Sequence, residues 1–304
     1  MLYAITHPTT YRYQSAVSVS QHLAHLRPRE TARQQVLEVA LEVEPTSATV
    51  VSREDYYGNL TDYLSVEGSH REFRVTARSR VRVTAPALPE PRSTLAWEKA
   101  REACTTDVLS TDSEVGEFLF DSPFITTAEP FADYARRSFA AGRPILEAVA
   151  DFIGRIFRDF QFDRRATTIA TPVEEVFRRR RGVCQDFAHL AITCLRSLGL
   201  PARYVSGYIE TVPPPGKARL VGADASHAWF AFWCPGFGWI DADPTNNLLC
   251  ADRHVTVAWG RDFSDVSPLR GVVVGGGEHR LQVAVDVEPI KEAKVESEKP
   301  GSGS

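Results

Sequence analysis

Three residue types that together can perform acyl transfer follow one another along the chain, namely Cys184, His227 and Asp243. A cysteine nucleophile needs a base that takes its proton, and the base needs an acceptor that orients its second ring nitrogen. Cys184 lies near the start of RGVCQDFAHLAITCLRSLGL, and His227 opens HAWFAFWC. Whether they form a site depends on the elements that carry them.

The segment that begins at Cys184 has the pattern of an amphipathic helix. Its apolar residues recur at the spacing of one helical face, and they are Phe187, Leu190, Ala191, Cys194, Leu195 and Leu198. Cys194 belongs to this stripe and is expected in the core, whereas Cys184 lies at the N-terminal edge. A helix start offers unsatisfied N–H groups and a partial positive charge, which favour a thiolate.

The residues beside Cys184 bear on its chemistry. The backbone N–H of Cys184 is available to stabilise an oxyanion, and Gln185 either adds a side-chain donor or faces solvent. Asp186 suits a helix start, but a carboxylate close to the thiol would oppose thiolate formation. We therefore expect the Asp186 side chain to turn away from the sulfur.

A predicted hairpin connects His227 to a carboxylate. The turn PGFG joins HAWFAFWC to WIDADP, and in an antiparallel pair the turn sets which residues are opposed. His227 then faces a residue between Asp243 and Asn247, with Asp243 opposite or diagonal. Asp241 lies on the same face of the strand as Asp243 and remains an alternative. The register that would bring Asp241 to His227 centres the turn less favourably on the Pro-Gly pair. A carboxylate beside the imidazole fixes its tautomer and raises its basicity.

The other histidines have no sequence connection to Cys184. His189 lies about 140° around the helix from Cys184, so it is expected to be structural. The remaining six are His7, His22, His25, His70, His254 and His279.

Composition narrows the class of protein. The net charge of −4 gives no support for nucleic-acid binding. The start of the chain has no apolar run of signal-peptide length, and no later run would span a bilayer, so we expect a cytoplasmic protein without a membrane partner. Five cysteines without a CxxC pair argue against a disulfide framework and a zinc site. We expect reduced thiols.

The chain divides by pattern into an α+β protein. Residues 1–86 alternate as an antiparallel β domain, most clearly in EFRVTARSRVRV, where apolar and polar residues alternate. Residues 87–140 are interpreted as a linker followed by helices. Residues 141–290 form the catalytic domain, with helices first and strands after Leu200. The polar tail, residues 291–304, is expected to be disordered.

Three segments resemble the transglutaminase-like superfamily, whose catalytic core is similar to that of papain. They are RRGVCQDFAHLAITCLRSLGLPARYVSGY, SHAWFAFWCPGFGW and DADPTNN. The resemblance implies that Cys184 is the nucleophile, His227 the base and Asp243 the orienting acid. It also implies a core of helices packed on an antiparallel sheet. No acidic loop resembles the calcium sites of the animal enzymes, so we expect neither a metal nor another cofactor.

The N-terminal region resembles the β-rich domain that accompanies the bacterial branch of this superfamily. The matching segments are YAITHPTTYRYQSAVSVSQHLAHLRPRE and DYYGNLTDYLSV. The resemblance thus extends over most of the chain and is weakest between residues 87 and 140.

These residues predict a cysteine acyl-transfer enzyme that attacks a carboxamide or peptide carbonyl and forms a thioester. The substrate would be a protein, a peptide or a small amide. If water attacks the thioester, the protein is an amidase or protease. If a primary amine attacks it, the protein is a transglutaminase. Both fates use the same three residues and stay open. The alternative is a non-catalytic scaffold or peptide-binding module, which the presence of all three residues disfavours.

Overall fold

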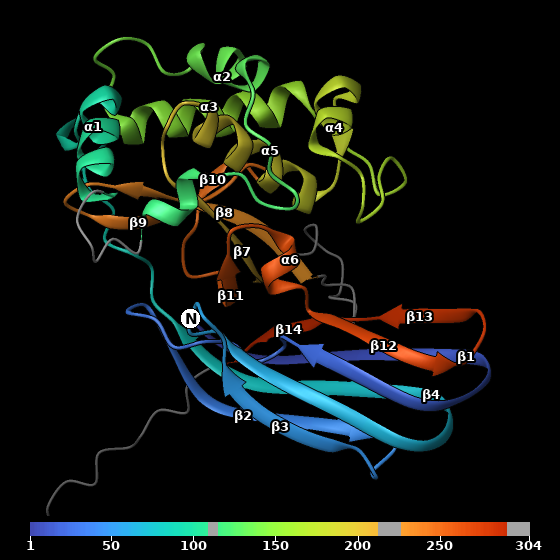
Figure 1. Ribbon diagram of the computed structural model, residues 1–304. Helices are drawn as coiled ribbons and strands as arrows, with labels where there is room; N and C mark the ends of the chain where they lie inside the picture. The colour runs from blue at the N-terminus through green and yellow to red at the C-terminus, as the bar shows by residue number, and fades with distance from the viewer. Residues whose placement is uncertain (109–114, 212–225, 291–304) are drawn as a thin grey trace, which may run out of the picture.

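A computed structural model describes residues 1–108, 115–211 and 226–290, which form two antiparallel sheets and a helical layer (Figure 1). The N-terminal sheet lies at the bottom of the view, a smaller sheet lies above it, and the helices cover the smaller sheet from the other side. The expected α+β class, with a β-rich N-terminal part and a helix-on-sheet core, is confirmed. The tail expected to be disordered, residues 291–304, lies outside the described residues, as does most of the Pro-rich segment after Glu210.

The N-terminal sheet is built around two long strands, β1 and β4. Its alternation follows the sequence pattern, since Phe73 and Val75 are buried while Arg74 and Arg78 are exposed. Gly58 has a φ of +69° in the turn that joins β3 to β4, where glycine is favoured. The strands of this part are β1 (Leu2–Ala24), β2 (Gln34–Glu44), β3 (Thr49–Glu54) and β4 (Leu60–Val83).

Three C-terminal strands return to this same sheet and pair with β1. Their bounds are β12 (Leu269–Gly275), β13 (His279–Val283) and β14 (Asp286–Pro289). The sequence pattern had grouped everything up to residue 290 with the catalytic domain, so the spatial arrangement differs from that division. The reason is that alternation predicts a strand but does not indicate which distant strand it joins.

The smaller sheet has the strand order β10-β9-β8-β7-β11 and is antiparallel throughout. Its strands are β7 (Ala202–Ile209), β8 (Ser226–Cys234), β9 (Gly238–Asp243), β10 (Leu248–Leu249) and β11 (His254–Gly260). Strands β7 and β8 are buried along nearly their whole length. That explains why β8 carries apolar residues on both faces, from Ala228 to Trp233.

The helical layer follows β4 in the chain and ends at β7. Its elements are η1 (Pro91–Ser93), α1 (Trp97–Val108), η2 (Gly116–Leu119), α2 (Glu129–Arg136), α3 (Ile145–Asp159), α4 (Val173–Arg179) and α5 (Cys184–Ser197), with β5 (Gln161–Phe162) paired to β6 (Arg181–Gly182). A short helix, α6 (Phe263–Val266), follows β11.

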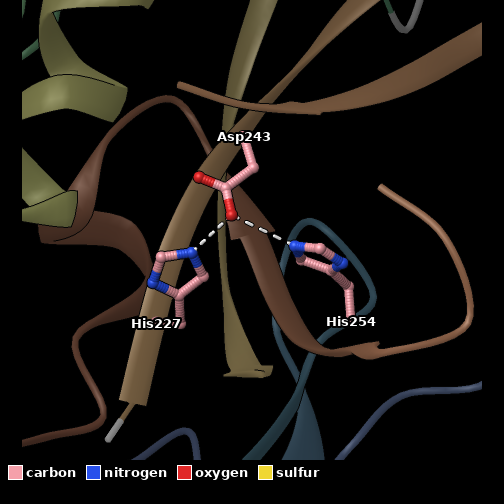
Figure 2. A group of neighbouring side chains, drawn as sticks. All are labelled: His227, Asp243 and His254. Atoms are coloured by element: carbon pink, nitrogen blue, oxygen red, sulfur yellow. Dashed lines mark hydrogen bonds and ion pairs between the residues drawn. The ribbon is translucent and has the colours of Figure 1, made fainter. Parts of the chain in front are cut away.

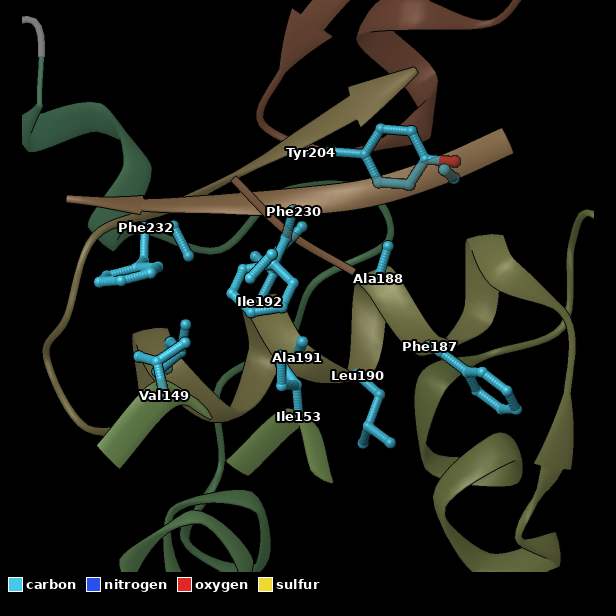
Figure 3. Packing of buried hydrophobic residues seen from close by; sticks show 14 of the residues in the cluster. Val149, Ile153, Phe187, Ala188, Leu190, Ala191, Ile192, Tyr204, Phe230 and Phe232 are labelled. Carbon is cyan, nitrogen blue, oxygen red and sulfur yellow. The ribbon is translucent and has the colours of Figure 1, made fainter. Parts of the chain in front are cut away.

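Helix α5 is the centre of the core, between α3 and the smaller sheet. Figure 3 shows Ile192 beside Phe230 of β8, and Leu190 and Ala191 toward Ile153 of α3. The expected apolar stripe of α5 is buried along its length. This burial supplies most of the free energy that holds the helix in place.

The N-terminal sheet holds β11 through two buried amide side chains. Gln34 donates to the carbonyl of Thr256 (2.6 Å) and accepts from its N–H (2.8 Å). Asn59 does the same with Trp259, at 2.8 and 3.0 Å. Each amide thus satisfies a backbone donor and acceptor that an edge strand would otherwise leave unpaired.

All five cysteines are free thiols. Among the residues that the structure describes, none of the helices has the length and apolar character that crossing a bilayer requires.

Candidate active site

Cys184 is the first residue of α5, and the residue before it adopts an extended conformation. Asp186 shapes this helix start, because its carboxylate accepts a hydrogen bond from the Val183 N–H at 2.8 Å. The carboxylate lies directly over Gly182, where an added Cβ would come within 2.7 Å of Oδ2. The glycine is thus required for this cap, and Asp186 is used to begin the helix.

The other polar side chain at the helix start is also engaged. The Gln185 amide nitrogen donates to the carbonyl of Ile169 at 3.3 Å, a hydrogen bond that lies at the surface. The two cysteines of α5 differ sharply in environment. Cys184 is half-buried, whereas Cys194 is fully buried and desolvation raises its pKa far above the ordinary value.

The hairpin β8–β9 brings His227 and Asp243 together. Phe230 pairs with Ala242 in the register, so Asp243 is diagonal to His227, within the range that the turn predicted. His227 Nε2 lies 2.7 Å from Asp243 Oδ2. Asp241 forms an ion pair with Arg33 of the N-terminal part, so the structure does not bring this alternative carboxylate to the histidine.

Asp243 is fully buried and accepts five hydrogen bonds. Oδ1 accepts from the backbone N–H groups of Thr245 (2.9 Å) and Asn246 (3.2 Å), an Asx turn that the sequence DPTN favours. Oδ2 accepts from the Asn246 amide at 2.7 Å, from His227, and from His254 at 3.2 Å. A carboxylate with so many donors stays ionised.

The same hydrogen bonds set the charge of the imidazole. Burial opposes a positive charge on His227, but its hydrogen bonds to Asp243 and Cys184 outweigh this and raise its pKa to about 10. Burial likewise opposes the charge on Asp243, yet the hydrogen bonds from His227 and His254 hold its pKa well below the usual range. Because Nε2 of His227 is occupied by Asp243, Nδ1 is the ring nitrogen left for the thiol. The arrangement therefore favours an imidazolium at His227, with Nδ1 toward Cys184.

His254 is the residue of this cluster that sequence reasoning missed. It begins β11, an edge strand separated from β8 by β7, and its Nε2 reaches the same carboxylate oxygen from the other side (Figure 2). The only sequence signal was a histidine at the start of a strand. Nothing local indicated that this strand pairs with β7.

The ligand atoms of His227, Asp243 and His254 lie within 4.8 Å of one another, a spacing that also occurs in metal sites. In Figure 2 both histidine nitrogens point at the same carboxylate oxygen, at 2.7 and 3.2 Å. A bound transition metal needs each ligand atom about 2.0–2.2 Å from a common centre. Two hydrogen bonds to one acceptor account for this geometry.

Cys184 and His227 line one open cleft of about 510 Å³. Its walls come from the loop after β5, the start of α5, the ends of β7 and β8, and the turn after β9; they include Phe162, Arg164, Ile209, Glu210, Asn246 and Arg253. Two further cavities, of about 490 and 590 Å³, lie where the N-terminal part meets the smaller sheet. They share Arg203, Trp239 and Trp259, and neither is lined by a cysteine or histidine. The cleft at Cys184 is therefore the candidate active site.

Known proteins show the family to which this fold and cleft belong. Residues 3–82 match the bacterial transglutaminase-like N-terminal region, and residues 132–244 match the transglutaminase-like superfamily. An uncharacterized protein of Mycobacterium tuberculosis is 42% identical over 299 residues, which are 95% of this chain and 93% of the relative. The chain belongs to the transglutaminase-like superfamily, in the bacterial branch that carries this N-terminal region.

Two further likenesses concern the core and the fold. A protein-glutamine gamma-glutamyltransferase of Pseudomonas aeruginosa is 30% identical over 126 residues, which are 39% of this chain and 18% of that protein. A crystal structure from Cytophaga hutchinsonii, described as a "Putative Cysteine Protease", superposes with a TM-score of 0.72 at 21% identity and covers 96% of this chain and 92% of its own. The second likeness shows that the whole arrangement of N-terminal sheet and core is shared.

Proposed function

We propose that this protein is a cysteine-dependent acyl-transfer enzyme that acts on carboxamide or peptide bonds, with Cys184 as nucleophile, His227 as acid and base, and Asp243 as the orienting acid. The observation that carries the proposal is the hydrogen-bonded series from the thiol through the imidazole to the buried carboxylate, open to one cleft. Membership of the transglutaminase-like superfamily supports the same class of chemistry.

In the first half-reaction the Cys184 thiolate attacks the carbonyl carbon of the substrate. A C–S bond forms and the carbonyl electrons move to oxygen. When they return, the C–N bond breaks and the amine leaves with the proton of the His227 imidazolium. The product is a thioester on Cys184.

In the second half-reaction water or a primary amine loses a proton to His227 and attacks the thioester. The C–S bond breaks, and the thiolate and imidazolium are restored. Water gives a carboxylic acid, whereas an amine gives a new amide, so hydrolysis and transfer differ only in the second substrate. A protein, a peptide or a small amide would all supply the acyl group.

The start of α5 supplies stabilisation for the oxyanion. The first N–H groups of a helix lack partners within the helix, and they carry a partial positive charge. The N–H of Cys184 belongs to this first turn. Donors that are already in place where charge develops are worth more than donors that must reorient.

Alkylation by iodoacetamide across pH, mapped by mass spectrometry, tests the nucleophile without a known substrate. Cys184 should react with a midpoint well below the ordinary thiol pKa of about 8.5, and His227→Ala should move that midpoint up. A wild-type Cys184 that titrates as an ordinary thiol would contradict the proposal.

Ammonia release from a glutaminyl peptide, measured with and without a primary amine, then separates the two fates. Incorporation of the amine identifies a transferase, and release of the acid alone identifies a hydrolase. Cys184→Ala serves as the blank for both readings.

A further inference from the structure

The carboxylate of Asp243 has a second histidine on the side away from the cleft. His254 is 1% exposed, and its Nε2 lies 3.2 Å from Asp243 Oδ2. Its ring is packed edge-on against Trp229, with the ring centroids 5.1 Å apart. Trp229 in turn lies over Gly207 of β7, where an added Cβ would come within 2.5 Å of the indole. His254 is thus held in place by packing and not only by its hydrogen bond.

The contacts of His254 indicate its protonation state. Asp243 Oδ2 can only accept, so Nε2 of His254 carries the proton. Nδ1 is buried and has no hydrogen-bond partner among the described residues. An imidazolium would leave a buried N–H without an acceptor there, which is costly. Burial lowers the pKa of His254 and its hydrogen bond to Asp243 opposes this, with a net decrease. Both arguments give a neutral ring with its proton on Nε2.

We propose that His254 is a positioning residue for the proposed acyl-transfer site: as a neutral donor on the far side of Asp243, it stabilises the buried negative charge that the cluster carries when Cys184 has lost its proton. This inference rests on the proposed function.

The charge balance of the cluster explains the effect. With Cys184 as a thiol, the His227 imidazolium and the Asp243 carboxylate cancel. Once the proton of the thiol is lost, the cluster of Cys184, His227 and Asp243 carries a net charge of about −1, whichever atoms hold the remaining proton. The Asp243 carboxylate accepts this hydrogen bond, at 3.2 Å from Oδ2, in both states, but the positive end of the donor dipole stabilises the cluster more when its net charge is −1 than when its charges cancel. Its loss should therefore raise the pH at which the nucleophile forms.

Few other titratable groups act on His254. They are Asp243, His227 and, at longer range, Asp241. The ring centroids of His227 and His254 are 6.2 Å apart. Asp241 is already paired with Arg33. Removing the imidazole of His254 therefore changes mainly the surroundings of Asp243.

The experiment compares His254→Phe, which keeps a planar ring but removes the donor, with His254→Gln, whose amide nitrogen can donate from a similar position. Iodoacetamide alkylation of Cys184 is followed from pH 5 to 9 on the full chain. His254→Phe should raise the midpoint by about one pH unit, which is about a tenfold slower reaction on the acid side. His254→Gln should remain within about half a unit of wild type.

His22→Phe is the matched control. His22 is a buried histidine that stacks on Phe73 in the N-terminal part, and its Nε2 also lacks a partner among the described residues. It should leave the midpoint unchanged. A wild-type profile for His254→Phe, or an equal shift for the Phe and Gln variants, would overturn the inference. If His227→Ala leaves the profile unchanged as well, the proposed function itself fails.

Nitrogen-15 NMR of the histidine rings tests the same inference in the unmodified chain, so it does not depend on whether His254→Phe folds. His254 should show the neutral form with its proton on Nε2, unchanged between pH 5 and 8. A ring that titrates in this range, or that carries its proton on Nδ1, would contradict the role.

Discussion

The two walls of the cleft are built by different forces. The helical wall, α5, carries Cys184, and its position is set by an apolar stripe buried between α3 and the sheet (Figure 3). The sheet wall carries His227, and Asp243 and His254 lie behind it. Both histidines are positioned by hydrogen bonds to the buried carboxylate of Asp243 (Figure 2).

This difference separates stability from reactivity. Hydrophobic burial contributes to the free energy of folding, but because it is non-directional it does not determine where protons are bound. A buried polar network specifies proton positions, and one missing partner leaves a charge or a donor unsatisfied. Substitutions behind the cysteine should therefore change mainly stability, whereas substitutions around Asp243 should change mainly the pH dependence and rate of the reaction.

The largest expected effect is that of Cys184→Ala, because no other described thiol is placed to replace it. Acyl transfer should fall by at least about 10⁴-fold, while the free energy of unfolding should change by less than about 1 kcal/mol. The measurements are peptide turnover and chemical denaturation. Cys194→Ala, on the same helix, should lower the free energy of unfolding and leave turnover nearly unchanged. A large loss of turnover in this variant would contradict the separation of stability from reactivity.

Asp243→Asn should reduce turnover by about 10³- to 10⁴-fold, since an amide no longer fixes the His227 tautomer or supports its positive charge. The matched control is Asp241→Asn, two residues earlier on the same strand. Steady-state kinetics on both variants should show a loss for position 243 alone. Similar losses at both positions would mean that the diagonal contact with His227 is not what matters.

The raised pKa of His227 predicts a pH-dependent contribution to stability. Its folded pKa of about 10 lies above the ordinary value of 6.5, so its contribution is complete below about pH 6.5 and is lost as pH rises toward 10. Denaturation of wild type and His227→Gln at successive pH values should show their difference shrinking over this window. A difference that grows with pH would show that the imidazole is neutral in the folded protein.

Phe230→Ala tests the helical wall. Phe230 is fully buried on β8 beneath α5, so its truncation should cost about 3–5 kcal/mol of unfolding free energy. The alkylation midpoint of Cys184 in the folded protein should stay as in wild type. A shifted midpoint would show that packing and proton positions are coupled across the cleft.

The smallest effect is expected for Gln34→Ala, which removes the two hydrogen bonds between the Gln34 side chain and the backbone of Thr256 in β11. Two backbone groups of Thr256 lose their partners, for a cost of about 1–3 kcal/mol. Because Thr256 lies two residues from His254, the rate of Cys184 alkylation should fall by no more than about threefold. Thermal denaturation measures the loss of stability, and alkylation measures the reactivity of Cys184. An unchanged melting temperature would show that β11 does not need the hydrogen bonds from Gln34.

Much of the fold was predictable because local patterns encode it. The alternation from Phe73 to Val83 and the stripe of α5 predicted which residues are buried. Local patterns also have a limit, since Phe157 has the same spacing as the buried apolar residues of α3 and is nevertheless 51% exposed. A stripe defined by spacing does not indicate how wide a face the neighbouring elements cover.

The sequence by itself placed His227 in a hairpin with Asp241 and Asp243 and favoured Asp243, because a short hairpin has few possible registers and its turn residues select among them. The structure then decided between the two carboxylates. It also determined that Cys184 begins a helix and Cys194 lies inside the protein. Only the tertiary structure decided that residues 269–289 join β1, that Asp186 caps α5, and that His254 reaches Asp243 across two intervening strands. Those contacts link residues far apart in the chain, and their free energy arises from burial and hydrogen bonds that no local periodicity records.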